Sequence, residues 1–193
     1  MTWDPYLDLE HGVLRNRLGI TDPEALRTAE ADYTAVRLAQ LAHHGLPGAY
    51  DLAHLQAFHR HIFGDVYAWA GELRTVAIGK GGSPFCRPEN LAADAVELFA
   101  WLARAGHLRG LDRATFVDDL TKLAADLNAL HPFREGNGRT QRAFLRQLAR
   151  DAGRPIRWAL LEAEENVAAA KAAQAEDLAP LRALLDRLVS PDA

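Results

Sequence analysis

HPFREGNGRTQRAF, residues 131–144, concentrates polar chemistry in a chain that otherwise consists of apolar segments with helical spacing. Its first twelve positions hold a histidine, a glutamate, an asparagine, two glycines and three arginines. The stretch follows one apolar-periodic run and leads into another, which predicts a short loop between two helices. Because loops held by rigid helices often carry binding and catalytic groups, this loop is the first candidate site.

The segments on either side of this loop predict a mainly α fold. At the start of the first run, Thr21 and Glu24 have the spacing of a capping box, with Pro23 in the first turn. Asp112 is a candidate N-cap for the helix that leads to His131, and the apolar stripe of that helix predicts the centre of the core. We predict helices over about 22–43, 51–63, 89–105, 113–130, 137–151, 162–175 and 177–189.

Residues 73–86, LRTVAIGKGGSPFC, interrupt the helical pattern. TVAI has β-prone side chains, GKGG is a turn sequence, and SPFC is short and contains a proline, which together predict a small β-hairpin. A two-stranded hairpin has an open edge, and such an edge can bind an extended peptide through main-chain hydrogen bonds. A surface loop without this role is the alternative that the sequence leaves open.

Length and composition favour one domain spanning residues 1–193. An apolar fraction of 49% is typical of a globular protein, and no apolar run approaches the roughly 20 residues that a membrane helix needs. The acidic start, MTWDPYLDLEHG, lacks the features of a signal peptide, so we expect a cytoplasmic protein with no membrane partner. The net charge of −4 argues against direct binding to nucleic acid, so any anion site must be local.

The loop at 131–144 has the features of such an anion site. Gly136 and Gly138 allow positive φ and a close approach of a ligand to the backbone. The helix behind them offers unpaired N–H groups and the positive end of its dipole, which favour phosphate. Arg139 and Arg142 lie three residues apart in its first turn, so both can donate to phosphate oxygens on one side. The alternative is a helix C-cap followed by a tight turn.

Glu135 and His131 add two functions to this phosphate site. A carboxylate beside phosphates is repelled unless a cation lies between them, so Glu135 is a candidate Mg²⁺ ligand. The alternative is an exposed glutamate paired with an arginine. His131 follows an apolar helix face, where a buried core histidine is the ordinary interpretation. Because imidazole titrates near neutrality and the phosphate site starts five residues later, we interpret His131 as a general base.

The same residues resemble the signature of the Fic family. HPFREGNGRTQR matches it without gaps: His, any residue, Phe, any residue, Asp or Glu, then Gly-Asn-Gly-Arg, two residues and Arg. VYAWAGELRTV, residues 66–76, is similar to the segment that leads into the target-docking flap of Fic proteins. The resemblance covers the family's core, at about 50–152, and implies a helical Fic core with a small β-hairpin flap and flanking helices at both ends.

The resemblance also implies a role for each residue. His131 would deprotonate a target hydroxyl, Glu135 would hold Mg²⁺ on the phosphates of ATP, and Phe133 would pack into the core. The anion hole and the sites for the outer phosphates would be formed by the residues Gly136, Asn137, Gly138, Arg139 and Arg142. The flap, which would clamp a segment of the target as an added strand, comprises Gly79, Lys80, Gly81 and Gly82.

The activity that this resemblance implies is transfer of AMP from ATP to a hydroxyl side chain of a target protein, with release of pyrophosphate. Transfer of UMP, phosphocholine or phosphate is an alternative within the same fold. A non-catalytic interaction module is an alternative of another class. Resemblance to small stand-alone bacterial Fic toxins implies a toxin, with a type II topoisomerase subunit as the first candidate target.

Regulation is predicted from a missing motif. Many Fic proteins carry an inhibitory helix with Ser or Thr, three residues and Glu, and this glutamate pairs with the second arginine of the signature. No Ser or Thr of this chain has Glu four positions later, and Thr28 with Asp32 is the nearest substitute. We therefore expect a small helical antitoxin to supply the glutamate to Arg142 in trans.

Two other polar patterns do not predict a site. His54, His59 and His61 lie at spacings of five and two, which do not place them on one helix face for a metal. Gly79 and Lys80 lack the glycine that a Walker loop requires five positions earlier, because position 74 is Arg.

Overall fold

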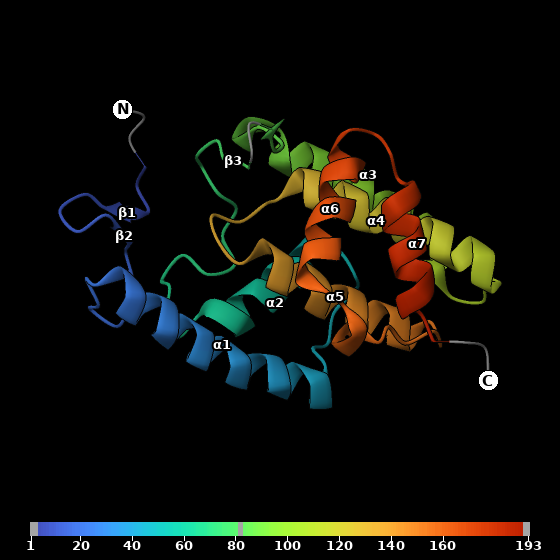
Figure 1. The fold of residues 1–193 in the computed structure, drawn as a ribbon, viewed down its shortest axis with the longest axis horizontal. Coiled ribbons are helices and arrows are strands. Elements are labelled where there is room, and N and C mark those ends of the chain that lie inside the picture. Colours follow the sequence, from blue (N-terminus) through green and yellow to red (C-terminus); the bar gives the residue numbers. More distant parts are fainter. Residues whose placement is uncertain (1–3, 81–82, 191–193) are drawn as a thin grey trace.

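The computed structural model describes residues 4–80 and 83–190, and the prediction of a mainly α fold is confirmed (Figure 1). Apolar side chains from all seven described α-helices form one core. The helices are α1 (Pro23–His44), α2 (Leu52–Phe63), α3 (Leu91–Arg104), α4 (Arg113–Leu130), α5 (Asn137–Asp151), α6 (Ala163–Gln174) and α7 (Ala179–Leu188). The predicted bounds lie within two residues of these. No helix of the described ranges is both long and apolar enough to cross a bilayer.

Helix α4 is the central helix that its apolar stripe predicted. The carboxylate of Asp112 accepts a hydrogen bond from the Thr115 amide at 3.0 Å, so the predicted N-cap is confirmed. Phe116, Leu120 and Leu123 are fully buried, and α4 packs against α3, α5, α6 and α7. This packing fixes the C-terminal end of α4, from which the loop at 131–136 emerges.

Helix α1 begins with a different cap from the one predicted. Asp22, rather than Thr21, accepts the hydrogen bond from the Ala25 amide, at 2.8 Å, so the capping-box prediction is wrong. Pro23 is the first helical residue, as its fixed φ favours, and the N-cap is therefore the residue directly before it.

A short hairpin near the N-terminus was not predicted. Strand β1 (Leu7–Asp8) pairs antiparallel with β2 (Val13–Leu14). Strands of two residues are too short to show a period in the sequence. Tyr6, directly before β1, packs edge-on against Trp69 with ring centroids 5.3 Å apart, which fixes the hairpin to the helical body.

The hairpin expected within residues 73–86 is confirmed, but its strands lie closer to the turn than predicted. Strand β3 (Gly79–Lys80) pairs antiparallel with β4 (Ser83–Pro84). TVAI, residues 75–78, is not a strand, so that part of the prediction is wrong. The predicted turn residues Gly81 and Gly82 lie outside the described residues.

Next to the strands the Phe85 amide still donates to the Ile78 carbonyl, at 3.1 Å, and beyond this pair the main chain is hydrogen-bonded to α4 and to the loop that follows it. The Arg74 amide donates to the Pro132 carbonyl and the Cys86 amide donates to the Ala129 carbonyl, both at 2.9 Å. Both ends of the hairpin are therefore attached to the end of α4 and to the loop that follows it.

Candidate active site

His131 caps the C-terminal end of α4 in a left-handed backbone conformation, with φ 44° and ψ 60°. Its Nδ1 lies 3.2 Å from the Asn128 carbonyl oxygen. A carbonyl can only accept, so Nδ1 carries the proton of the neutral ring and Nε2 is the basic nitrogen. Phe85 stacks on the imidazole with centroids 3.7 Å apart and planes 8° apart, which fixes the plane of the ring. This geometry suits a general base.

Phe133 and Asn137 attach the loop to the core. Phe133 is 1% exposed, which places it where the resemblance implied. The Asn137 side chain accepts a hydrogen bond from the Phe133 amide at 2.9 Å and donates one to the Phe133 carbonyl at 2.7 Å. The side-chain amide of Asn137 thus closes the loop, and the main-chain N–H groups are left to form the anion site.

Gly136 makes the sharp turn that starts α5. It has φ 78°, and a Cβ atom at this position would lie 2.1 Å from Cζ of Phe63, which is fully buried. Only glycine fits both the backbone conformation and the contact. Asn137 and Gly138 follow as the first residues of α5, whose initial N–H groups have no intrahelical acceptor.

The Glu135 carboxylate lies beside this helix terminus, with its side chain 45% exposed. Its Oε1 accepts a hydrogen bond from the Gly136 amide at 2.8 Å and lies 3.6 Å from Nη2 of Arg139. Among the described residues, no group donates a hydrogen bond to Oε2. A single carboxylate oxygen facing a phosphate site is the ligand that Mg²⁺ combines with phosphate oxygens and waters, so the donor set fits this ion.

The structure separates the three arginines of residues 131–142. Arg134 pairs with Asp4 at 2.9 Å, and Arg139 pairs with Glu30 of α1 at 2.6 Å. Arg142 makes no ion pair with any described carboxylate. Burial lowers the pKa of the Arg142 guanidinium, and the charge of Arg139 lowers it further. The uncompensated positive charge of the site therefore lies on Arg142.

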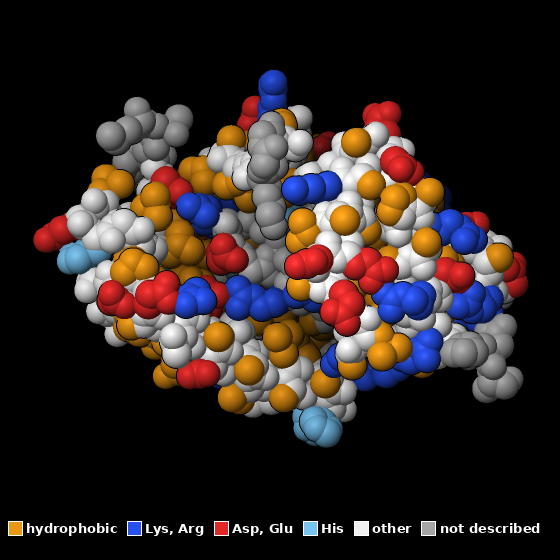
Figure 2. Space-filling model, viewed as in Figure 1, with side chains coloured by type: hydrophobic (Ala, Val, Ile, Leu, Met, Phe, Trp, Pro, Cys, Tyr) orange, Lys and Arg blue, Asp and Glu red, His pale blue; other side chains and the backbone are white. Residues whose placement is uncertain are grey.

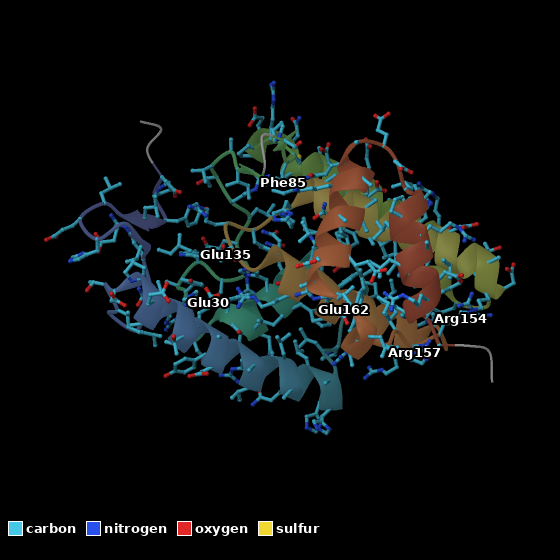
Figure 3. The ribbon with its side chains drawn as sticks, in the orientation of Figure 1. Glu30, Phe85, Glu135, Arg154, Arg157 and Glu162 are labelled. Carbon is cyan, nitrogen blue, oxygen red and sulfur yellow. The ribbon has the colours of Figure 1, made fainter. Side chains whose placement is uncertain are left out.

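All the candidate groups of residues 131–142 except Arg139 line one cavity of about 630 Å³, a volume that suits a small-molecule ligand. Its wall comes from the hairpin, the loop, α5 and α6, and includes Gly79, Phe85, His131, Glu135, Gly138, Arg142, Asn166 and Lys171. Arg139, which the sequence grouped with the phosphate ligands, is not part of this wall. In Figure 3, Phe85 and Glu135 mark the hairpin side and the loop side of the cavity.

A family model described as Fic/DOC family matches residues 49–149. The chain belongs to the Fic/DOC family. It is 44% identical over 162 residues to protein adenylyltransferase VbhT of Bartonella schoenbuchensis, an alignment that covers 84% of this chain and 34% of VbhT. It is 41% identical to "Probable protein adenylyltransferase y4lH" of Sinorhizobium fredii, over 92% of this chain and 91% of that protein.

Solved structures of Fic domains share this fold. The N-terminal Fic domain of a VirB-translocated Bep effector protein from Bartonella quintana, solved with bound ADP, has a TM-score of 0.88 against this chain. The two are 27% identical, and the match covers 97% of this chain and 95% of the other.

Two buried residues that the sequence did not identify as part of the site, His59 and Arg74, hold the loop at 131–136 in place. Nε2 of His59 lies 3.0 Å from the Glu135 carbonyl oxygen, and Nδ1 accepts a hydrogen bond from the Gly71 amide at 2.8 Å. Nε of Arg74 donates to the His131 carbonyl at 2.8 Å. The only sequence signal was a polar residue within an apolar segment, because the partners lie 76 and 57 residues away.

The neutral state of His59 predicts a pH dependence of stability. Burial lowers its pKa to about 4, and the charges of Arg139 and Arg60 act in the same direction, although the hydrogen bond to the Glu135 carbonyl raises it. In the unfolded chain the imidazole titrates near 6.5. Between pH 6.5 and 4 the folded state therefore binds fewer protons, and its free energy of unfolding should fall by about 3 kcal/mol as the pH falls through this window.

Urea unfolding at pH 7, 6, 5 and 4.5 measures this loss. A His59→Gln variant should be less stable at pH 7 and lose less stability on acidification, because glutamine does not titrate. His61, whose pKa burial also lowers, contributes equally to both proteins. Equal pH slopes for the two proteins would show that His59 does not cause the dependence.

Proposed function

We propose that this chain is a protein adenylyltransferase, which transfers AMP from ATP to a hydroxyl side chain of another protein. The observation that carries the proposal is that an oriented imidazole, a carboxylate with one oxygen available, and an amide-lined helix terminus border one cavity. The curated relatives named as adenylyltransferases support it.

In this reaction Nε2 of His131 takes the proton of the target hydroxyl, and the hydroxyl oxygen forms a bond to the α-phosphorus of ATP. The bond from the α-phosphorus to the oxygen that bridges to the β-phosphorus breaks, and pyrophosphate leaves. The amides at the start of α5 stabilise the negative charge that develops on the α-phosphate. Glu135 holds Mg²⁺, which neutralises phosphate charge when it is bound.

The target segment binds along the hairpin of β3 and β4, which we name the flap. Gly79 borders the cavity. One end of the flap is attached to the loop at 131–136, which we name the catalytic loop, and the other end to the last turn of α4. An extended segment added to an open strand edge here would present its hydroxyl to His131. The residues predicted to dock the target are Gly79, Lys80, Gly81 and Gly82, of which Gly81 and Gly82 lie outside the described residues. A type II topoisomerase subunit in the cytoplasm is the first target to test.

One labelling experiment tests this function. The purified chain is incubated with Mg²⁺, a lysate or a purified topoisomerase subunit, and labelled ATP, UTP, CTP or GTP. We expect label from ATP alone and an added AMP on a Ser, Thr or Tyr of the target by mass spectrometry. Transfer from UTP would support the UMP alternative, and nucleotide binding without any transfer would support a non-catalytic module.

We also propose that the chain acts as a toxin and that an antitoxin helix controls it by pairing a glutamate with Arg142. A groove between α1 and α5 leads to this arginine. Its lining combines apolar and basic side chains: Leu38, Leu41, Trp158, Arg142, Arg146 and Arg150. Figure 2 shows basic side chains, interspersed with acidic ones, across the middle of this face, with apolar side chains below them. An amphipathic helix with acidic residues complements such a lining.

The internal substitute, Thr28 with Asp32, does not fill this role in the structure. Asp32 is exposed on α1 and makes no ion pair with a described residue. The labelling assay tests the proposal, because the unmodified chain should transfer label without any activating substitution. If transfer appears only after Asp32 or Glu30 is replaced, inhibition is internal and an antitoxin is not needed.

Arg142→Ala should weaken ATP binding by at least about 10-fold, because charge-assisted hydrogen bonds to phosphate contribute about 1.5–3 kcal/mol. Arg146→Ala is the matched control: it lies one turn further along α5, in the groove but not in the wall of the cavity. Calorimetric titration with ATP measures both. If the Arg142 variant binds ATP as tightly as the Arg146 variant, Arg142 does not hold phosphate.

A further inference from the structure

Arg139 lies between two carboxylates. Its Nη2 atom is 2.6 Å from Oε1 of Glu30 and 3.6 Å from Oε1 of Glu135. Glu30 belongs to α1 and Glu135 to the catalytic loop, and Figure 3 shows them facing each other across the space between these elements. Arg139 therefore forms a short ion pair with Glu30, which lies outside the cavity, and a longer one with Glu135, which borders the cavity.

Buried groups hold the Glu30–Arg139 pair in place. The Tyr67 hydroxyl donates to Oε2 of Glu30, and burial raises the pKa of Tyr67 above its ordinary value, so the phenol remains a donor. Nη1 of Arg139 lies 3.3 Å from Oγ1 of Thr34, and the guanidinium lies 4.7 Å from the ring centroid of Phe63. Tyr67, Thr34 and Phe63 are each at most 2% exposed. The position of Arg139 is set by these contacts with α1 and α2 and the residues that follow α2.

We propose that Glu30 is a positioning residue for the metal-holding carboxylate. By binding Arg139 on the α1 side, it prevents the guanidinium from closing onto Glu135 and so leaves Glu135 to bind a divalent cation beside the nucleotide. Tyr67 supports this by orienting Glu30. The inference rests on the proposed function, because it concerns the Mg²⁺ that accompanies ATP.

Charge explains why the pairing matters. Glu30, Arg139 and Glu135 together carry a net charge of −1, which attracts a cation. If Glu30 were neutral, the nearest carboxylate to Arg139 would be Glu135, four residues away along the chain and already within 3.6 Å. A charge-assisted pair between arginine and carboxylate can use both carboxylate oxygens. Such a pair would compete directly with Mg²⁺ for Glu135.

The test is the Mg²⁺ dependence of ATP binding, measured by calorimetry in Mg²⁺ and in EDTA, which does not require turnover. In Glu30→Gln we expect the gain in ATP affinity caused by Mg²⁺ to fall by about 10-fold, as for other residues that orient metal ligands, with ATP affinity in EDTA unchanged. Tyr67→Phe should reduce the gain less. Glu24→Gln is the matched control, because Arg27, on the exposed side of the same helix, is the only described residue with which the Glu24 carboxylate pairs.

A double variant, Glu30→Gln with Arg139→Gln, makes the test specific. It removes the competing guanidinium, so the Mg²⁺-dependent gain should return to within about twofold of wild type. A gain that stays low in the double variant, or an unchanged gain in Glu30→Gln alone, would overturn the proposal. Tighter ATP binding by Glu30→Gln in EDTA would overturn it too, since Glu30 would then be holding Arg139 away from phosphate. If the ATP affinity of the wild-type chain did not depend on Mg²⁺, this would instead contradict the metal site of the proposed function.

Discussion

His131→Ala should lower the rate of AMP transfer by at least about 10²-fold, within the 10²- to 10⁴-fold range of a well-placed general base. The structure makes the reason specific. Nδ1 is committed to the Asn128 carbonyl and Phe85 fixes the ring plane, so Nε2 has one orientation toward the cavity. Alanine removes this nitrogen without touching the amides of α5, and ATP binding should therefore be retained.

Two measurements separate catalysis from folding in this variant. The initial rate of label transfer from ATP reports the chemical step, and calorimetry reports ATP affinity. His43→Ala, at the exposed end of α1, is the matched control and should transfer at the wild-type rate. If His131→Ala retained a rate near that of the control, another group would be the base and the proposed mechanism would be wrong.

Gly136→Ala should destabilise the chain by about 2–4 kcal/mol and abolish high-affinity ATP binding. A side chain at φ 78° costs about 1 kcal/mol or more. The added Cβ would also lie 2.1 Å from the buried ring of Phe63, and overpacking of this kind costs typically 1–3 kcal/mol. Relief of the clash would move the amides at the start of α5, which bind the phosphate. Urea unfolding and calorimetry measure the two effects.

Gly138→Ala provides the control for this prediction. Gly138 has a helical backbone, and a Cβ there would meet only the flexible end of Arg142, at 3.3 Å. The stability of the Gly138→Ala variant should therefore equal or slightly exceed that of wild type. In a Phe63→Ala background, Gly136→Ala should cost less than in wild type, because the clash is gone. An equal loss of stability in both backgrounds would show that the contact with Phe63 does not cause the destabilisation.

The sequence by itself determined the helices and the order of the functional residues. Helical spacing and local stop signals predicted both ends of each of the seven described α-helices to within two residues, because these signals act between neighbours in the chain. The stretch at 131–142 specified the loop, the glycine turn and the start of α5 for the same reason. The family assignment followed from the same twelve positions and was confirmed by the family model.

Only the tertiary structure decided which partners the polar side chains use. Arg139 pairs with Glu30, 109 residues away, and His59 hydrogen-bonds to the carbonyl of Glu135, 76 residues away. The attachment of the flap was decided in the same way, since the Arg74 amide bonds to the catalytic loop and the Cys86 amide to the end of α4. Local periodicity carries no information on such pairs. They form because buried polar groups must find hydrogen-bond partners, and which groups meet depends on how the helices pack.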